Sequence, residues 1–393
     1  MVFCARPLIK EDSTRGLIMS DERIYWVALN KVKGIGAVRF RALLDAFGSA
    51  QNAWQADSQA LREAGLNQVV IDHLLQVRQE LDLTHITADL EERQINVLTW
   101  EDSAYPRRLR ELDQSPPVLY VRGNLLPEDE WAVAVVGTRR VTAYGRQVAE
   151  ELGAFLAQNG ITLVSGLARG VDIISHQAAL NAGGRSIAVM AHGLDQVYPA
   201  EHRHVAEEIA ARGALVSDYA LGTPPDSANF PPRNRIISGL SLAVVIIEAG
   251  EESGALITAG FAAEQGREVF ALPGNIYAPQ SKGCNLLIQR GAHPLLHFEE
   301  LLEALNLEMM GEHKVARVAL PADATEAKLF GLLGVEPLHV NEIGALAELP
   351  IEQVSSTLAL MELKGLVRQV GGMNYVAARE LHGEYSTDSK AKR

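Results

Sequence analysis

Glycine, hydroxyl and arginine side chains follow an apolar run of this chain at positions where they could hold an anion. Gly137-Thr138-Arg139-Arg140 comes directly after the run that ends at Val136, just before a helical pattern that begins near Ala143. Glycine lets the backbone approach a ligand, and a helix N-terminus, a threonine hydroxyl and a guanidinium all donate hydrogen bonds. The spacing therefore predicts a phosphate or carboxylate site.

A second loop of the same kind, SGLARGVD, follows the next apolar run from Ser165 to Asp172. We expect sheet topology to bring its Arg169 near the first loop, and Asp172 to cap the following helix and orient that arginine. The alternative is that the glycines serve only tight turns. The candidate residues here are Ser165, Gly166, Ala168, Arg169 and Gly170.

Two later segments extend the set of anion-binding candidates. ANFPPRNRIISGLS, residues 228–241, joins an aromatic ring to an arginine cluster, and residues 252–258 start another helix after an apolar run. Phe230 suits stacking against an unpaired base, although an ordinary core position is the alternative. The candidate residues of these segments are Phe230, Arg233, Asn234, Arg235, Ser253, Gly254 and Thr258.

The common nucleotide and metal signatures are missing from the sequence. Gly137 does not begin a G-x-G-x-x-G fingerprint, and no Walker-type lysine loop occurs, which argues against NAD and ATP. His202 and His204 stand two residues apart at a helix start, so they face different directions. We therefore predict no cofactor, no metal and no catalytic constellation.

The elements that position these candidates are read from hydrophobic periodicity. Apolar runs at 133–136, 161–164, 186–189, 214–217, 242–247 and 269–271 alternate with amphipathic helices. Because such continuous runs are typical of strands covered on both faces, they predict a mostly parallel, doubly wound, Rossmann-like α/β sheet.

Smaller units are predicted on either side of the sheet. The helical pattern near the N-terminus contains Lys33-Gly34-Ile35-Gly36, a turn that resembles a helix-hairpin-helix. Lys33, Gly34 and Gly36 could contact a duplex or its backbone, or the turn could simply join packed helices.

After a polar linker, the order of three helices and a hairpin turning on Gly371-Gly372 predicts a winged helix. Its third helix carries Glu352, Glu362 and only Lys364, which favours protein contact over DNA reading.

These patterns divide the chain into six segments: a disordered extension at 1–18, a helical domain at 19–92, the Rossmann-like domain at 93–307, a linker at 308–324, the winged helix at 325–379 and a disordered tail at 380–393. The formal net charge of −13 argues against a protein that coats nucleic acid indiscriminately, but it allows a local basic groove. The two cysteines, Cys4 and Cys284, suggest a reducing compartment, and with no secretory or membrane-spanning pattern the expected location is cytoplasmic.

VAVVGTRRVTAYG, TLVSGLARGVD, FPPRNRIISGLS and SGALITA, in this order, closely resemble the DNA-processing protein A (DprA/Smf) family, and the stretch 267–292 extends the match. The resemblance implies a protein that binds single-stranded DNA, forms a homodimer through the Rossmann-like domain and helps load the RecA recombinase in natural transformation, without being an enzyme. Carried onto this chain, the family's pocket would comprise Gly137, Thr138, Arg139, Ser165, Gly166, Arg169, Phe230, Arg233, Asn234 and Arg235.

Two rival functions remain. Nucleotide phosphoribohydrolases share the fold, but they carry P-G-G-x-G-T-x-x-E, and here Phe261 stands three residues after Thr258 where that motif has glutamate. A winged-helix transcription regulator would need a more basic third helix than this chain has.

Overall fold

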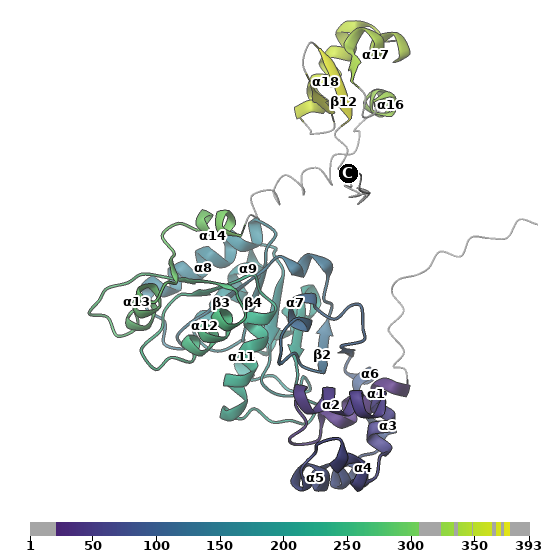
Figure 1. The fold of residues 1–393 in the computed structure, drawn as a ribbon. Helices are drawn as coiled ribbons and strands as arrows, with labels where there is room; N and C mark the ends of the chain where they lie inside the picture. Colours follow the sequence, from purple (N-terminus) through teal and green to yellow (C-terminus); the bar gives the residue numbers. More distant parts are fainter. Residues whose placement is uncertain are drawn as a thin grey trace, which may run out of the picture. The chain divides into compact units, whose positions relative to one another are not determined.

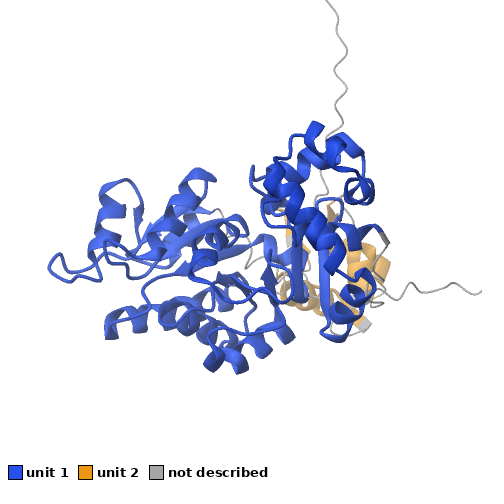
Figure 2. Cartoon of the chain, turned by 90° about the horizontal axis from the view of Figure 1, so that it is seen from below, with its two compact units in different colours: residues 1–305 blue, residues 306–393 orange. Residues whose placement is uncertain are grey.

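The computed structural model describes residues 21–305, 324–333, 337–347, 349–363, 367–370 and 373–377 (Figure 1). The chain divides into two compact units, residues 1–305 and 306–393 (Figure 2), and each is described by itself. The predicted extension 1–18, the tail 380–393 and all of the predicted linker except residue 324 lie outside the described residues.

Six helices begin the first unit: α1 (Asp21–Asn30), α2 (Ala37–Phe47), α3 (Ala50–Gln55), α4 (Ser58–Glu63), α5 (Gln68–Glu80) and α6 (Leu83–Glu92). Side-chain caps start several of them, because Ser49, Asp57 and Asn67 each accept a hydrogen bond from a first-turn N–H. Trp26 and Phe40 are buried with their ring centroids 4.8 Å apart. Both pack edge-on to the Trp100 ring, so the helices rest against the first strand of the sheet.

The sheet has nine strands in the order β1-β2-β6-β5-β4-β3-β7-β8-β9 within the described residues. Their bounds are β1 (Ile95–Thr99), β2 (Val118–Gly123), β3 (Ala132–Val136), β4 (Thr162–Ser165), β5 (Ser186–Val189), β6 (Ala214–Ser217), β7 (Ala243–Ile246), β8 (Glu268–Ala271) and β9 (His293–Pro294). Strands β3 to β9 are parallel to one another, whereas β2 is antiparallel to both β1 and β6. The predicted Rossmann-like fold is confirmed, with β1 and β2 added at one edge.

Helices cover this sheet: α7 (Arg107–Arg110), α8 (Ala143–Gln158), α9 (Val171–Asn181), α10 (Arg203–Arg212), α11 (Phe230–Gly239), α12 (Gly254–Glu264), α13 (Lys282–Gln289) and α14 (Glu299–Ala304). Helices α11, α12 and α13 contribute Ile236, Ala259 and Cys284 to a core that also contains β3 and β7 residues. The chain moves from β3 to β4 on one side and later returns to β7 on the other. The strand order therefore reverses at β3, where open α/β sheets bind their ligands.

The second unit is the predicted winged helix. It contains α16 (Ala324–Leu332), α17 (Val340–Ala347) and α18 (Ile351–Leu363), with β10 (Leu338–His339), β11 (Val367–Gln369) and β12 (Asn374–Ala377) in a sheet ordered β10-β12-β11. Helix α18 carries no lysine or arginine. Lys364 and the turn at residues 371–372 lie outside the described residues. None of the helices in the described ranges is long and apolar enough to cross a bilayer.

Candidate nucleic-acid interface

A pocket of about 740 Å³ opens where the strand order reverses. It is lined by the loop after β3, the first residues of α11, and the loop after β7 that leads into α12. We call it the switch-point pocket. Ten of the predicted residues line it: Gly137, Thr138, Arg139, Ala168, Phe230, Arg233, Asn234, Ser253, Gly254 and Thr258.

The loop after β3 supplies the exposed cations of the switch-point pocket. Arg139 and Arg140 are exposed, and neither guanidinium forms an ion pair with any residue that the structure describes. The backbone beneath them is fixed, since Thr138 N–H donates to the Glu248 carbonyl at 2.6 Å and the Arg140 N–H donates to Thr138 Oγ1 at 3.1 Å. Two free positive charges on a held loop are suited to an external anion.

Helix α8 starts where the sequence predicts, but its first hydrogen bonds have partners inside the protein. The helix begins at Ala143, but a buried carboxylate already serves its N-terminus: Thr142 N–H donates to Glu248 Oε2 at 2.9 Å, and Thr142 Oγ1–H donates to Oε1 at 2.5 Å. The Thr142 hydroxyl in turn accepts from Gly145 N–H at 3.2 Å. The expectation that this helix end offers unpaired amides to a ligand is therefore wrong at these positions. The exposed guanidinium groups of Arg139 and Arg140 remain available to an anion in the pocket.

The loop after β4, residues 166–170, contributes only Ala168 to the lining of the pocket. Ser165 donates to the Val135 carbonyl at 2.6 Å, and neither Ser165, Gly166 nor Gly170 lines the pocket. Arg169 also lies outside its lining and pairs with Glu201 at 2.6 Å on the surface. Consequently, this loop does not present its arginine to the pocket.

Asp172 has a different role from the predicted one of orienting Arg169. Its buried carboxylate accepts from Gly166 N–H at 3.1 Å and from Ala168 N–H at 3.4 Å, so it holds the loop after β4. Burial raises the pKa of this carboxyl, and the Arg233 guanidinium opposes that rise.

Arg233 forms the inner wall of the pocket. It is only 3% exposed and donates to the carbonyls of Gly166 and Val189, which fixes the ends of β4 and β5. Burial lowers its pKa to about 10, so the guanidinium stays charged at neutral pH. Its charge therefore contributes to the pocket while its hydrogen bonds serve the fold.

Phe230 lies at the mouth of the pocket between cations. Its ring centroid is 5.7 Å from the Arg139 guanidinium and 5.8 Å from that of Arg233. The Tyr198 ring is 6.0 Å away and 44% exposed. The pair offers aromatic surface beside positive charge, the combination that single-stranded nucleic acid binds.

Asn234 and α12 complete the lining. Asn234 Nδ2 donates to the Gly254 carbonyl at 3.4 Å, which links α11 to the start of α12. Ser253 caps α12 by accepting from Ala255 N–H, and Thr258 is buried one turn later. Glu252 stands on the rim, the one exposed carboxylate residue in the pocket's lining.

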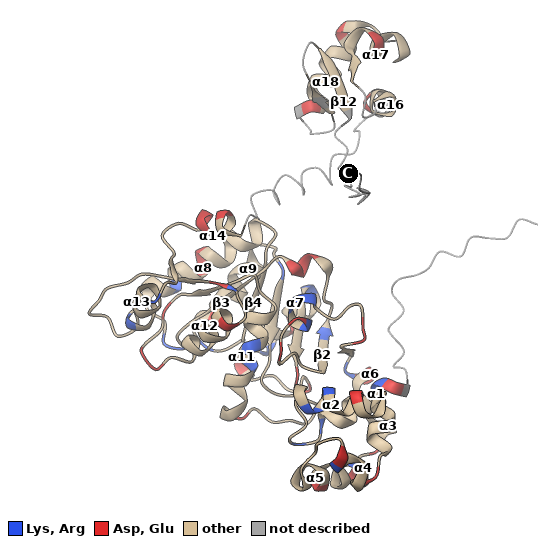
Figure 3. Ribbon diagram, viewed as in Figure 1, with Lys and Arg blue, Asp and Glu red and all other residues tan. Residues whose placement is uncertain are grey.

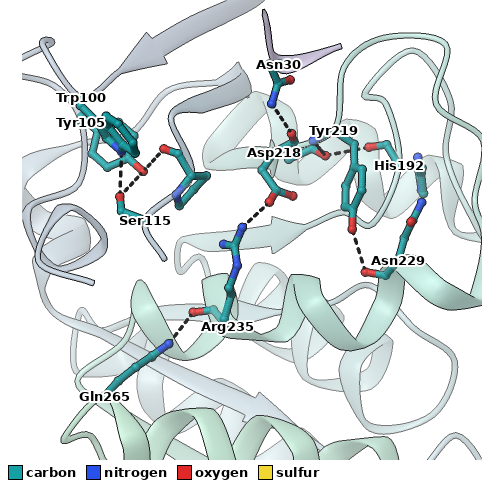
Figure 4. Close-up of polar contacts among 12 residues, drawn as sticks. Asn30, Trp100, Tyr105, Ser115, His192, Asp218, Tyr219, Asn229, Arg235 and Gln265 are labelled. Atoms are coloured by element: carbon teal, nitrogen blue, oxygen red, sulfur yellow. Dashed lines mark hydrogen bonds and ion pairs between the residues drawn. The ribbon is translucent and has the colours of Figure 1, made fainter. Parts of the chain in front are cut away.

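Arg235 points away from the switch-point pocket. It pairs with Asp218 at 2.7 Å, while Gln265 donates to the Arg235 carbonyl at 3.0 Å (Figure 4). Residues two apart on a helix lie on nearly opposite sides, so Arg233 and Arg235 cannot face one pocket once 230–239 is helical. The prediction that groups them in a single pocket is therefore not met by this placement.

Two residues near the pocket were not among those expected from the sequence. Glu248 lies two residues after the end of β7, and Tyr198 stands in the segment after β5. The rule that functional side chains follow the strands could have indicated both. Glu248 was missed because an acidic residue does not suggest an anion site unless its partner, the first turn of α8, is known.

The helical turn predicted to contact a duplex lies elsewhere. Lys33, Gly34 and Gly36 join α1 to α2 and line a separate cavity, and Gly34 has a φ of +99°.

In the described ranges no three His, Cys, Asp or Glu side chains gather to hold a metal, and His202 Nδ1 lies 2.8 Å from the Leu167 carbonyl. Cys284 is buried, and burial raises its pKa to about 12.

Family models match three stretches of the chain. The model of "DNA recombination-mediator protein A" matches residues 96–306, that of the "DprA-like N-terminal HHH domain" residues 20–82, and that of the "DprA winged helix domain" residues 313–373. Each agrees with the element order described above, and together they confirm the resemblance noted in the sequence.

Individual relatives agree. Protein Smf of Synechocystis sp. is 35% identical over 393 residues, which cover 91% of this chain and 99% of the relative. The DNA processing protein DprA of Bacillus subtilis is 38% identical over 261 residues, covering 64% of this chain and 88% of the relative. The X-ray structure of DNA processing protein A from Streptococcus pneumoniae superposes with a TM-score of 0.62 at 33% identity, covering 71% of this chain and 97% of that one.

Proposed function

The chain belongs to the DNA-processing protein A (DprA/Smf) family, and from this premise we propose that it binds single-stranded DNA in the switch-point pocket. The observation that carries the proposal is the exposed Arg139, without an ion-pair partner in the described structure, beside the Phe230 ring. A phosphate can pair with the guanidinium while an unpaired base stacks on the ring. A base inside a duplex is already stacked on both faces, so this arrangement favours a single strand.

We further propose the role that the family resemblance implies. The chain protects incoming DNA and helps load RecA during natural transformation and recombination, acting in the cytoplasm as a homodimer through its Rossmann-like domain. The segments 19–92, 93–307 and 325–379 serve as its domains, with the winged helix contacting protein rather than DNA. Sedimentation of the purified chain and a pull-down with RecA test these two associations.

The proposed role is not enzymatic. The phosphoribohydrolase alternative needs a glutamate where this chain has Phe261, and Phe261 does not line the switch-point pocket. Asp172, the buried carboxylate of that pocket, is held by backbone amides. Release of free base from a nucleoside monophosphate by the purified protein would favour the enzyme instead.

Fluorescence anisotropy of labelled oligothymidine tests the proposal. Arg139→Ala should weaken binding, and it should reduce the slope of log K against log salt concentration by about 0.7, the value for one phosphate of a single strand. Arg93→Ala is the matched control, because Arg93 is also exposed but lines neither large cavity. Equal affinity of the wild type for duplex, or equal effects of the two substitutions, would contradict the proposal.

A further inference from the structure

A second cavity, of about 1040 Å³, lies between the N-terminal helices and the sheet. One wall is the turn from Asn30 to Ala37 with the last turn of α5, and the opposite wall is the segment from Asp218 to Pro224 after β6. Asn30 donates to the Asp218 carbonyl at 3.4 Å, a hydrogen bond that joins the two walls (Figure 4). Asn30 also accepts from Tyr120 of β2 at 3.1 Å. The cavity is thus part of the fold of the first unit.

The charges of the second cavity favour an anion. Its charged side chains are Lys31, Lys33, Arg39, Arg235, Glu80 and Asp218, four basic and two acidic. Both acids have partners, since Asp218 pairs with Arg235 and Glu80 accepts from Gln76 at 2.9 Å. Lys31 and Lys33 form no ion pair with the residues described. A local excess of 4 − 2 = +2 in a chain of net charge −13 is a place where a phosphate would collect.

The second cavity adjoins the switch-point pocket. Consecutive residues line the two, Pro224 and Arg235 on this side and Pro225 and Asn234 on the other. Helix α11 contributes lining residues to both cavities, and basic residues occur on both α11 and α2 (Figure 3). A helix is about 10 Å across, a distance that a few nucleotides of a single strand can span.

We propose that one single strand of DNA runs from the switch-point pocket past Pro224-Pro225 into the second cavity, where Lys31 and Lys33 bind its phosphates. This inference rests on the proposed function and lengthens its footprint. It also gives the Lys33-Gly36 turn a specific ligand. Because the segment after β6 stands opposite this turn, the cavity receives an extended strand rather than the face of a duplex.

Oligothymidines of two lengths test the inference. A short one, about 6 nucleotides, fills only the switch-point pocket, and a long one, about 20, can reach both sites. Lys33→Ala should weaken binding of the long oligonucleotide about three- to tenfold and lower its salt slope by about 0.7, while leaving the short one unchanged. Arg139→Ala should weaken both, and Arg93→Ala neither.

The outcomes separate the inference from the proposed function. If Lys33→Ala affects both lengths equally or neither length, the second cavity is not part of the track, even though Arg139→Ala still weakens binding. If the wild type binds neither oligonucleotide, the proposed function fails and the inference with it. Lys31→Ala provides an independent check, and thermal unfolding of each variant confirms that it folds.

Discussion

Gly170 and Thr138 bring the first two strand-end loops into contact. The Val171 N–H donates to the Thr138 carbonyl at 3.2 Å, and Gly170 has a φ of +81°. A Cβ placed on Gly170 would lie much closer to that same carbonyl oxygen than van der Waals contact allows. Glycine is therefore required here for two reasons, its backbone conformation and its lack of a side chain.

Gly170→Ala should destabilise the protein and also weaken DNA binding. The positive-φ conformation costs a residue with a side chain about 1–3 kcal/mol, and forcing the loops apart adds about 1–3 kcal/mol. Gly183→Ala is the matched control, because Gly183 has a φ of +77° but open space around its Cβ position. Urea unfolding should show only the conformational cost for the control. Equal losses of stability in the two variants would mean that the contact with Thr138 does not matter.

Glu248→Gln should lower stability by about 1.5–3 kcal/mol, because Glu248 is buried and accepts charge-assisted hydrogen bonds from both the N–H and the hydroxyl of Thr142. Chemical denaturation measures the loss. Glu252→Gln removes the same charge at the exposed pocket rim and should leave stability unchanged while slightly strengthening DNA binding. If the rim variant is the less stable of the two, the assigned role of Glu248 is wrong.

Phe230→Leu should weaken binding of oligothymidine by about 1–2 kcal/mol, since it keeps an apolar side chain but removes the stacking face. The loss should persist at high salt, where phosphate contacts are weakened. Phe155→Leu is the control: Phe155 is also half-buried, and it packs on Phe298 rather than at a pocket. Anisotropy at two salt concentrations separates the stacking contribution from the ionic one. An unchanged affinity would place Phe230 in the pocket wall only.

Stability should fall as the pH drops from about 6.5 towards 3, because burial lowers the pKa of His176 from 6.5 to about 3. Below pH 6.5 the unfolded chain takes up a proton that the folded chain does not, so unfolding becomes easier. This histidine alone should cost about 2 kcal/mol between pH 7.5 and pH 5. His176→Asn, which can keep the contact with Ser186, should show a shallower pH dependence in urea titrations. Parallel pH profiles for variant and wild type would refute this assignment.

The parallel sheet could be predicted from the sequence because each of its long strands is a continuous apolar run. The antiparallel edge could not, since β2 is as apolar as its neighbours and only its partner β6 determines its direction. Hydrophobic periodicity reports which residues are buried. It does not report which strand lies alongside.

The pocket was predictable to the extent that it follows from strand ends. Gly137 to Arg139 lie where that rule places them. Arg235 was misplaced because the sequence FPPRNR looks like a loop until Phe230–Gly239 is known to be a helix, which then sends alternate arginines to different cavities. The loop that carries Arg169 does contact the first loop, as predicted, but the Arg169 side chain pairs with Glu201 and does not line the pocket. Glu201 is 32 residues away in sequence, a distance at which spacing gives no information.

The Arg139 guanidinium lies over the Phe230 ring before any DNA arrives. A base that stacks there must displace it, so binding is an exchange in which a cation–π contact is given up for a stacked base and a phosphate pair. The measured binding free energy is then the difference between the contacts that the base and phosphate form and the cation–π contact that they replace. For this reason the free energy lost in Arg139→Ala should understate the strength of the phosphate contact, whereas the salt slope counts it directly.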